Sequence, residues 1–143
     1  MTLLTTLDLP VIWAALIAVA VLLYVVLDGF DLGIGILFAV ERDDEHRDVM
    51  VNTVAPVWDG NETWLVLGGG GLFAVFPLAY AVVMPALYPT IFGMLLALVF
   101  RGVAFEFRFR AHSRAARRGW DLAFLAGSTV AALCQGLTLG GLL

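Results

Sequence analysis

The run from Thr63 to Phe100 constrains the fold most, because it contains no charged residue. As one helix it would be about 57 Å long at 1.5 Å per residue, whereas a bilayer hydrocarbon core is about 30 Å thick. The run therefore predicts two membrane-spanning helices with a turn at Phe76-Pro77, since proline cannot continue the preceding helical hydrogen bonds. The first of these two helices must then begin well before Thr63.

The composition supports a membrane protein, with 62% hydrophobic and only 14% charged residues. A formal net charge of −4 and the lack of a basic stripe exclude nucleic acid as a partner. The single cysteine excludes a disulfide framework and a cysteine metal site. The first ten residues carry no positive charge, which argues against a cleaved signal peptide.

Two more charge-free runs, Leu9–Leu27 and Leu122–Leu143, complete the pattern. We expect an all-α integral membrane fold of four transmembrane helices in one domain over residues 1–143. The expected helices cover roughly 10–38, 52–76, 78–107 and 121–143, with polar loops at about 41–50 and 108–119. Because the sequence stops at the end of an apolar helix, we expect a fragment of a longer protein.

Arginine placement predicts the orientation of these spans. Seven of the eight arginines fall in the two polar loops, so the positive-inside rule puts both loops in the cytoplasm and the N-terminus outside. Counting 1.5 Å per residue from the outer helix ends brings charged residues of all four helices to one layer near the cytoplasmic boundary. These residues are Asp28, Asp31, Asp59, Glu62, Arg101 and Asp121.

An ionisable residue within a membrane is costly and is by default a candidate functional residue. Asp28 and Asp31 share one helix face, as residues three apart do, so we interpret them as part of a proton route or as partners of Arg101. The alternative is that both acids are solvated at the headgroups. Arg101 likewise could be paired in the layer, or could extend to the interface from the helix end.

Asp59 and Glu62 have the same spacing, and we interpret them as proton-path residues with Asp59 the stronger candidate. The alternative is that both acids only stabilise a helix N-terminus. Asp121 and Arg101 are the expected charge partners of the layer.

Glycines accompany both pairs of acids. Gly29, Gly33 and Gly35 follow Asp28, and Gly68, Gly69, Gly70 and Gly71 follow Glu62. No strand or lysine accompanies the second run as in a phosphate-binding loop, so close helix packing is the favoured interpretation of both sets.

A haem or metal site is not expected in this chain. Its two histidines, His46 and His112, fall in the polar loops, and Met84 and Met94 alone are weak haem ligands.

Four motifs together carry a resemblance to a known family. Asp28-Gly-Phe-Asp-Leu-Gly33, Ala55-Pro-Val-Trp-Asp-Gly-Asn61, Gly71-Leu-Phe-Ala74 and Phe100-Arg-Gly-Val-Ala-Phe-Glu-Phe-Arg108 resemble subunit II of the cytochrome bd quinol oxidases. The resemblance covers essentially the whole chain, which is similar to the N-terminal half of an eight-helix, two-half subunit. The motif at Phe100 is more similar to the cyanide-insensitive branch.

This resemblance implies a haem-free membrane subunit of a complex that oxidises quinol and reduces oxygen to water. It implies a haem-bearing partner, subunit I, with two b-type haems and a d-type or third b-type haem, in a bacterial or archaeal plasma membrane. No activity is expected from this chain alone. Asp59 matches a family residue of the cytoplasmic proton route, and Asp31 and Arg101 match positions in the same polar layer.

Two rival functions stay open at the level of sequence. Half of a proton-coupled transporter would also combine repeated halves with membrane-embedded acids, although such acids typically lie at the midplane. An assembly scaffold with inert acids is the second rival.

Overall fold

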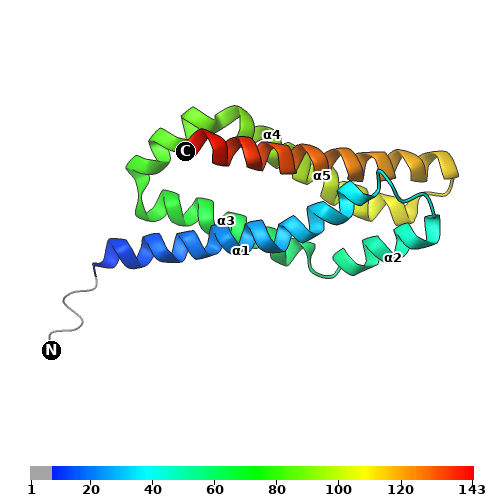
Figure 1. Cartoon of the computed structure of the whole chain (residues 1–143), viewed down its shortest axis with the longest axis horizontal. Helices are drawn as coiled ribbons and strands as arrows, with labels where there is room; N and C mark the ends of the chain where they lie inside the picture. The colour runs from blue at the N-terminus through cyan, green and yellow to red at the C-terminus, as the bar shows by residue number, and fades with distance from the viewer. Residues whose placement is uncertain (1–7) are drawn as a thin grey trace. The chain divides into compact units, whose positions relative to one another are not determined.

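The computed structural model describes residues 8–143, and all regular secondary structure in that range is α-helical. The expectations about the N-terminus itself rest on residues that lie outside this range. The five helices are α1 (Leu9–Leu37), α2 (Asp44–Val54), α3 (Trp58–Val75), α4 (Pro77–Arg110) and α5 (Arg114–Leu142) (Figure 1). The prediction of an all-α fold is confirmed.

Three helices are long and apolar enough to cross a membrane, namely α1, α4 and α5. The shorter α3 is about 27 Å long at 1.5 Å per residue, and it begins with the polar sequence Trp58-Asp59-Gly60-Asn61-Glu62. Among the described residues, the structure thus identifies three candidate spans, and a four-span count stays a prediction.

The chain forms two compact units. The first combines the described residues up to Asp28 with Trp58–Ala86, and the second combines Gly29–Val57 with Leu87–Leu143. The helix α4 continues through both Pro85 and Pro89, and the boundary between the units falls between these two prolines.

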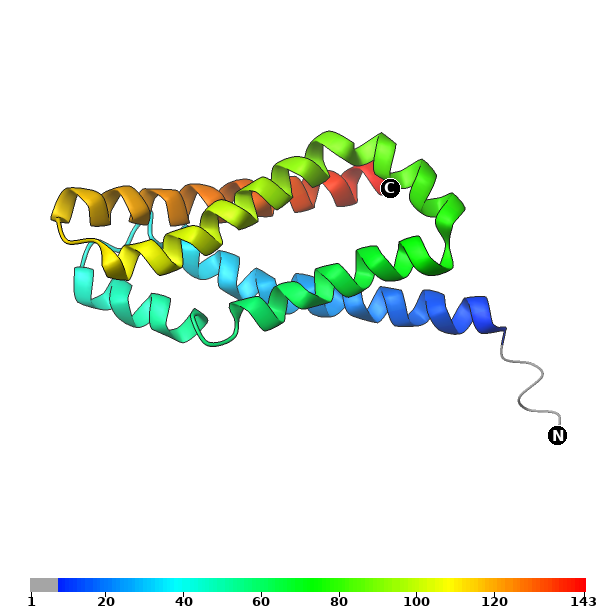
Figure 2. The same cartoon turned by 180° about the vertical axis from the view of Figure 1, so that it is seen from behind.

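In the first unit, α3 packs against the first part of α1, and the two helices run side by side in both views (Figures 1 and 2). A Cβ atom at Gly68 would lie 3.1 Å from Val21 Cγ2, and one at Gly71 would lie 3.2 Å from Ile17 Cγ1. A Cβ at Gly69 or Gly70 would meet no atom within 4 Å. Two of the four consecutive glycines therefore lie in a close helix contact.

The expected helix over 52–76 and the expected loop at 41–50 are wrong. Residues 44–54 form α2, because Asp43 caps it by accepting hydrogen bonds from the backbone N–H groups of Glu45 and His46. The helix ends before Pro56, whose ring and missing N–H disfavour its continuation, and α3 starts only at Trp58.

The expected loop at 108–119 is also wrong in extent, since only residues 111–113 separate α4 from α5. The helix α5 begins at Arg114 rather than near residue 121. Its N-cap is Ser113, whose hydroxyl accepts a hydrogen bond from Ala116 N–H at 3.1 Å. The alanines that follow favour a helix, and so do the arginines despite their charge.

In the second unit, α5 crosses the later part of α4 at Gly127. A Cβ atom there would lie 2.9 Å from the carbonyl oxygen of Ala97 and 3.2 Å from the backbone nitrogen of Arg101. Both neighbours are backbone atoms, so a larger residue requires one helix to move.

We predict that Gly127→Ala lowers the free energy of unfolding by roughly 1–3 kcal/mol, the usual cost of overpacking. The control is Gly136→Ala on the same helix, where an added Cβ meets no atom within 4 Å. That control is expected to be neutral, or stabilising by up to about 1 kcal/mol through helix propensity. Thermal unfolding in detergent, followed by near-UV circular dichroism, measures both, and equal effects would contradict the packing account.

Candidate functional site: two buried arginine sites and an acidic helix start

Arg101 and Asp31 form a buried ion pair within the second unit. Both side chains are 0% exposed, and Arg101 Nη2 lies 3.5 Å from Asp31 Oδ2. The pair joins α1 to α4. The headgroup-solvated alternative for Asp31 and the interfacial alternative for Arg101 therefore do not describe this structure.

Three phenylalanines of the same unit form a layer next to this ion pair. Phe38 and Phe105 both pack edge-on against Phe124, with ring centroids 5.0 and 4.8 Å from it. The guanidinium of Arg101 lies 5.8 Å from the Phe105 ring centroid. These rings come from the residue after α1 and from α4 and α5, so one aromatic layer covers the ion pair.

A second arginine site lies on the other side of the phenylalanines. Arg108, which is 2% exposed, donates from Nε to Asp121 at 2.5 Å and from Nη1 to Asp48. Arg47 donates to Asp121 at 3.1 Å, and Arg117 also binds Asp48. The guanidinium groups of Arg47 and Arg108 lie 5.2 and 5.6 Å from the Phe38 ring centroid.

Helical spacing explains this order of layers. Arg101, Phe105 and Arg108 are four and three residues apart on α4, so they lie on one face. Phe124 lies three residues after Asp121 on α5. About 10 Å of α4 separates the two arginines along the helix axis.

Asp121 is thus not part of the same layer as Arg101, which corrects the sequence prediction. Its partners are Arg108 and Arg47, whereas Arg101 is paired with Asp31. The prediction is wrong because Arg108 belongs to α4 and not to a loop. The signal that would have placed it is its i, i+7 relation to Arg101 on a helix that continues to Arg110.

Asp28 is buried at the end of the first unit's part of α1, with 0% exposure. The contacts Val21–Gly68 and Ile17–Gly71 describe an antiparallel register of α1 and α3. Continuing this register along both helices brings Asp28 level with about Asn61, between Asp59 and Glu62 on α3.

Asp59 lies in the first turn of α3 and is exposed, while Glu62 is half-buried. The position fits the alternative interpretation, in which an acid favours the positive N-terminal end of a helix. It also leaves the Asp59 side chain exposed on the surface of this chain.

As in α3, only some of the predicted packing glycines of α1 lie in a close helix contact. A Cβ at Gly35 would overlap the hydroxyl oxygen of the buried Ser128, so α1 and α5 meet there. A Cβ at Gly29 or Gly33 would meet no atom within 4 Å. The contact of Gly35 with Ser128 was not foreseen, because nothing in the local sequence identifies the partner helix.

Haem does not fit the side chains of the described residues. His46 and His112 are both exposed, in α2 and in the α4–α5 turn. Within residues 8–143, no group of three or more histidine, cysteine or acidic side chains converges as a metal site would require. No chemical step on a haem is therefore assigned to these residues.

The fold and site define a helical membrane protein with charged residues buried between its helices. Residues 9–143 match the family described as cytochrome bd terminal oxidase subunit II. This chain belongs to that family. The match favours the oxidase over the transporter among the sequence-level alternatives.

Curated relatives agree with this assignment. The chain is 39% identical over 133 residues to cytochrome bd-I ubiquinol oxidase subunit 2 of Escherichia coli K12, covering 92% of this chain and 35% of the relative. It is 38% identical over 133 residues to the probable cytochrome oxidase subunit 2 of Haemophilus influenzae, again covering 92% and 35%. It is 39% identical over 120 residues to cytochrome bd ubiquinol oxidase subunit 2 of Bacillus subtilis, covering 83% and 36%. The chain spans about a third of the length of these relatives.

We predict that Asp31→Asn destabilises the protein by about 3–5 kcal/mol, because it removes a carboxylate that lies 3.5 Å from the fully buried Arg101 guanidinium. The control is Glu106→Gln, which breaks an exposed pair with Arg110 at 3.2 Å on α4. That loss is expected to be below about 1 kcal/mol. Denaturant unfolding in detergent compares the two variants, and similar losses would refute the distinction.

Asp48 makes a pH-dependent contribution to stability outside the spans. Burial alone raises the pKa of its carboxyl, but hydrogen bonds from Arg117 and Arg108 outweigh burial and lower the pKa below its ordinary value near 3.8. A carboxyl whose pKa is lower in the folded state stabilises the fold above its unfolded pKa. This stabilisation is lost as the pH falls through the folded-state pKa.

We therefore expect the denaturant concentration at the unfolding midpoint to decrease once the pH is below about 4. The Asp48→Asn variant should show a smaller decrease. Denaturant midpoints measured between pH 7 and pH 3 test this. Glu45→Gln, an exposed acid of the same helix, should leave the pH profile unchanged. A profile of Asp48→Asn parallel to that of the unaltered protein would exclude Asp48 as the source.

Proposed function

We propose that this chain is part of a haem-free membrane subunit of a bd-type terminal oxidase, which oxidises quinol and reduces oxygen to water. The observation that carries the proposal is the family match over residues 9–143. Two of the relatives reported above are named as ubiquinol oxidase subunits. The chain has no activity of its own in this proposal. The two b-type haems and the d-type or third b-type haem belong to a partner, subunit I.

The proposed setting is a bacterial or archaeal plasma membrane, with four spans that form one half of an eight-helix subunit. The N-terminus lies on the outer side of the membrane, and the arginine-bearing end of α4 and start of α5 lie at the cytoplasmic face. This orientation puts the start of α3, with its exposed Asp59, on the side from which protons are taken up.

Asp59 is the proposed point of proton entry, and Asp28 and Asp31 are the proposed residues further along. Three features support this order. Asp59 is exposed, Asp28 is buried level with the first turn of α3, and Asp31 follows Asp28 by one helical turn on α1. Glu62 is a second acid of α3 that lies close to the level of Asp28. Arg101, held against Asp31, would stabilise a carboxylate at that point in the path.

We expect Asp59→Asn to slow oxygen reduction by the complete oxidase about tenfold or more, because an amide cannot relay a proton. Haem spectra of the complex should stay nearly unchanged. The matched control is Asp44→Asn, an exposed first-turn acid of α2, which alters helix-end electrostatics equally and should leave turnover unaffected. Turnover measured with quinol and an oxygen electrode tests the role of Asp59 in proton entry. An Asp59→Asn enzyme with unchanged turnover would favour the scaffold function.

A further inference from the structure

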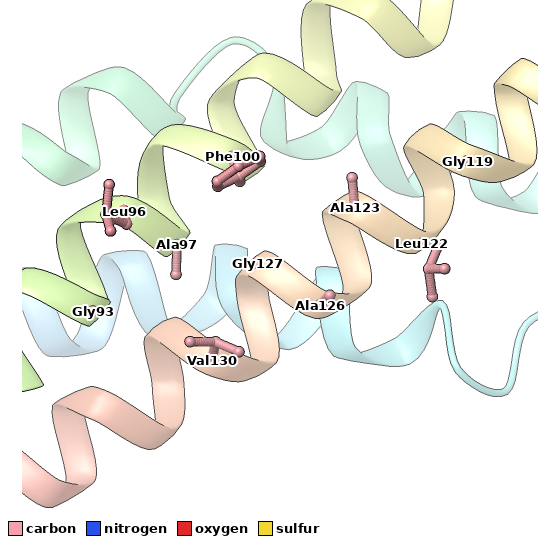
Figure 3. Close-up of a pocket in the computed structure, with 10 residues that line it drawn as sticks. All are labelled: Gly93, Leu96, Ala97, Phe100, Gly119, Leu122, Ala123, Ala126, Gly127 and Val130. Atoms are coloured by element: carbon pink, nitrogen blue, oxygen red, sulfur yellow. The ribbon is translucent and has the colours of Figure 1, made fainter.

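An open apolar groove of about 500 Å³ lies between α4 and α5 in the second unit. Figure 3 shows that its lining comes from these two helices alone, with only glycine and hydrocarbon side chains. Phe100 and Leu122 at its edge are 62% and 64% exposed. Small residues form its floor, and the exposed edge residues show that the groove is open to the surroundings of this chain.

One row of α5 residues connects this groove to two arginines. Arg114, Arg118, Leu122, Ala126 and Val130 are spaced four apart, so each lies beside the next in a continuous row that winds around the helix by about 40° per step. The last three line the groove. The first two are exposed at the start of α5, whose first turn carries no acid.

These two arginines differ from the others near the α4–α5 turn. Arg108 and Arg117 bind Asp48, and Arg110 pairs with Glu106. Within residues 8–143, the side chains of Arg114 and Arg118 form no hydrogen bond or ion pair. Their charge is therefore available to an anion outside the chain.

We propose that this groove binds an anionic phospholipid, with one acyl chain along the groove and the phosphate at Arg114 and Arg118. From Arg118 to Val130 the row extends about 18 Å, and one leaflet of a ~30 Å hydrocarbon core is about 15 Å deep. Basic pockets at the ends of transmembrane helices typically bind anionic headgroups. An apolar partner helix would fill the small-residue floor but would leave the two arginine charges unmatched.

The test uses the purified oxidase complex that contains the full chain, placed in phosphatidylcholine nanodiscs. The probe is phosphatidylglycerol with a photoactivatable acyl chain, added at a few mole percent and compared with a phosphatidylcholine probe of the same chains. Peptide mass spectrometry should locate phosphatidylglycerol labels within the segments 93–100 and 119–130. The phosphatidylcholine probe should label them several-fold less.

Removing the charge separates lipid binding from general apolar contact. Arg114→Gln with Arg118→Gln should lower labelling by about fivefold per arginine. The control, Arg42→Gln with Arg110→Gln, removes two other exposed arginines and should leave labelling unchanged. Ala123→Phe, which fills the groove without changing its charge, should lower labelling by both probes.

Three outcomes would overturn the proposal. Equal labelling by the two probes would show a groove with no preference for an anion. Unchanged labelling of the double arginine variant would exclude these residues as the headgroup site. Absence of label in both segments would show that a partner helix covers the groove in the complex.

Discussion

A guanidinium group buried among apolar helices must be matched by carboxylates, because its transfer from water costs several kcal/mol even after the structure relaxes. Arg101 meets this constraint through Asp31, and Arg108 meets it through Asp48 and Asp121. The two arginines occupy one face of α4. Their acids come from α1, α2 and α5, so satisfying both charges fixes which helices must meet in the second unit.

The aromatic layer follows from the same constraint. Phe38, Phe105 and Phe124 pack between the two arginine sites, and guanidinium groups approach two of the three rings. A cation beside an aromatic face gains more when it is desolvated, as Arg101 is here. Glycines then permit the close approach that the charges require. Gly127 lies against the backbone of Ala97 and Arg101, and Gly35 lies against Ser128.

Sequence reasoning predicted the features that depend on hydrophobic length and on proline. It predicted an all-helical membrane fold, the break at Pro77 and the family. It missed α2 and the early start of α5, because charged residues were assigned to loops although Asp43 and Ser113 are good N-caps. It assigned Asp121 to the wrong layer for the same reason. The three phenylalanines could not be predicted, since their contacts join residues far apart in the chain.

The central claim is that Arg101 and Asp31 act as one buried unit on which the proposed proton path depends. A double-mutant cycle of Asp31→Asn and Arg101→Gln, measured by unfolding of the purified protein in detergent, tests it most directly. The account predicts that the double variant loses much less stability than the sum of the two single losses, by on the order of 1–3 kcal/mol. Strictly additive losses would contradict the claim, because they would show that the two side chains contribute to stability independently.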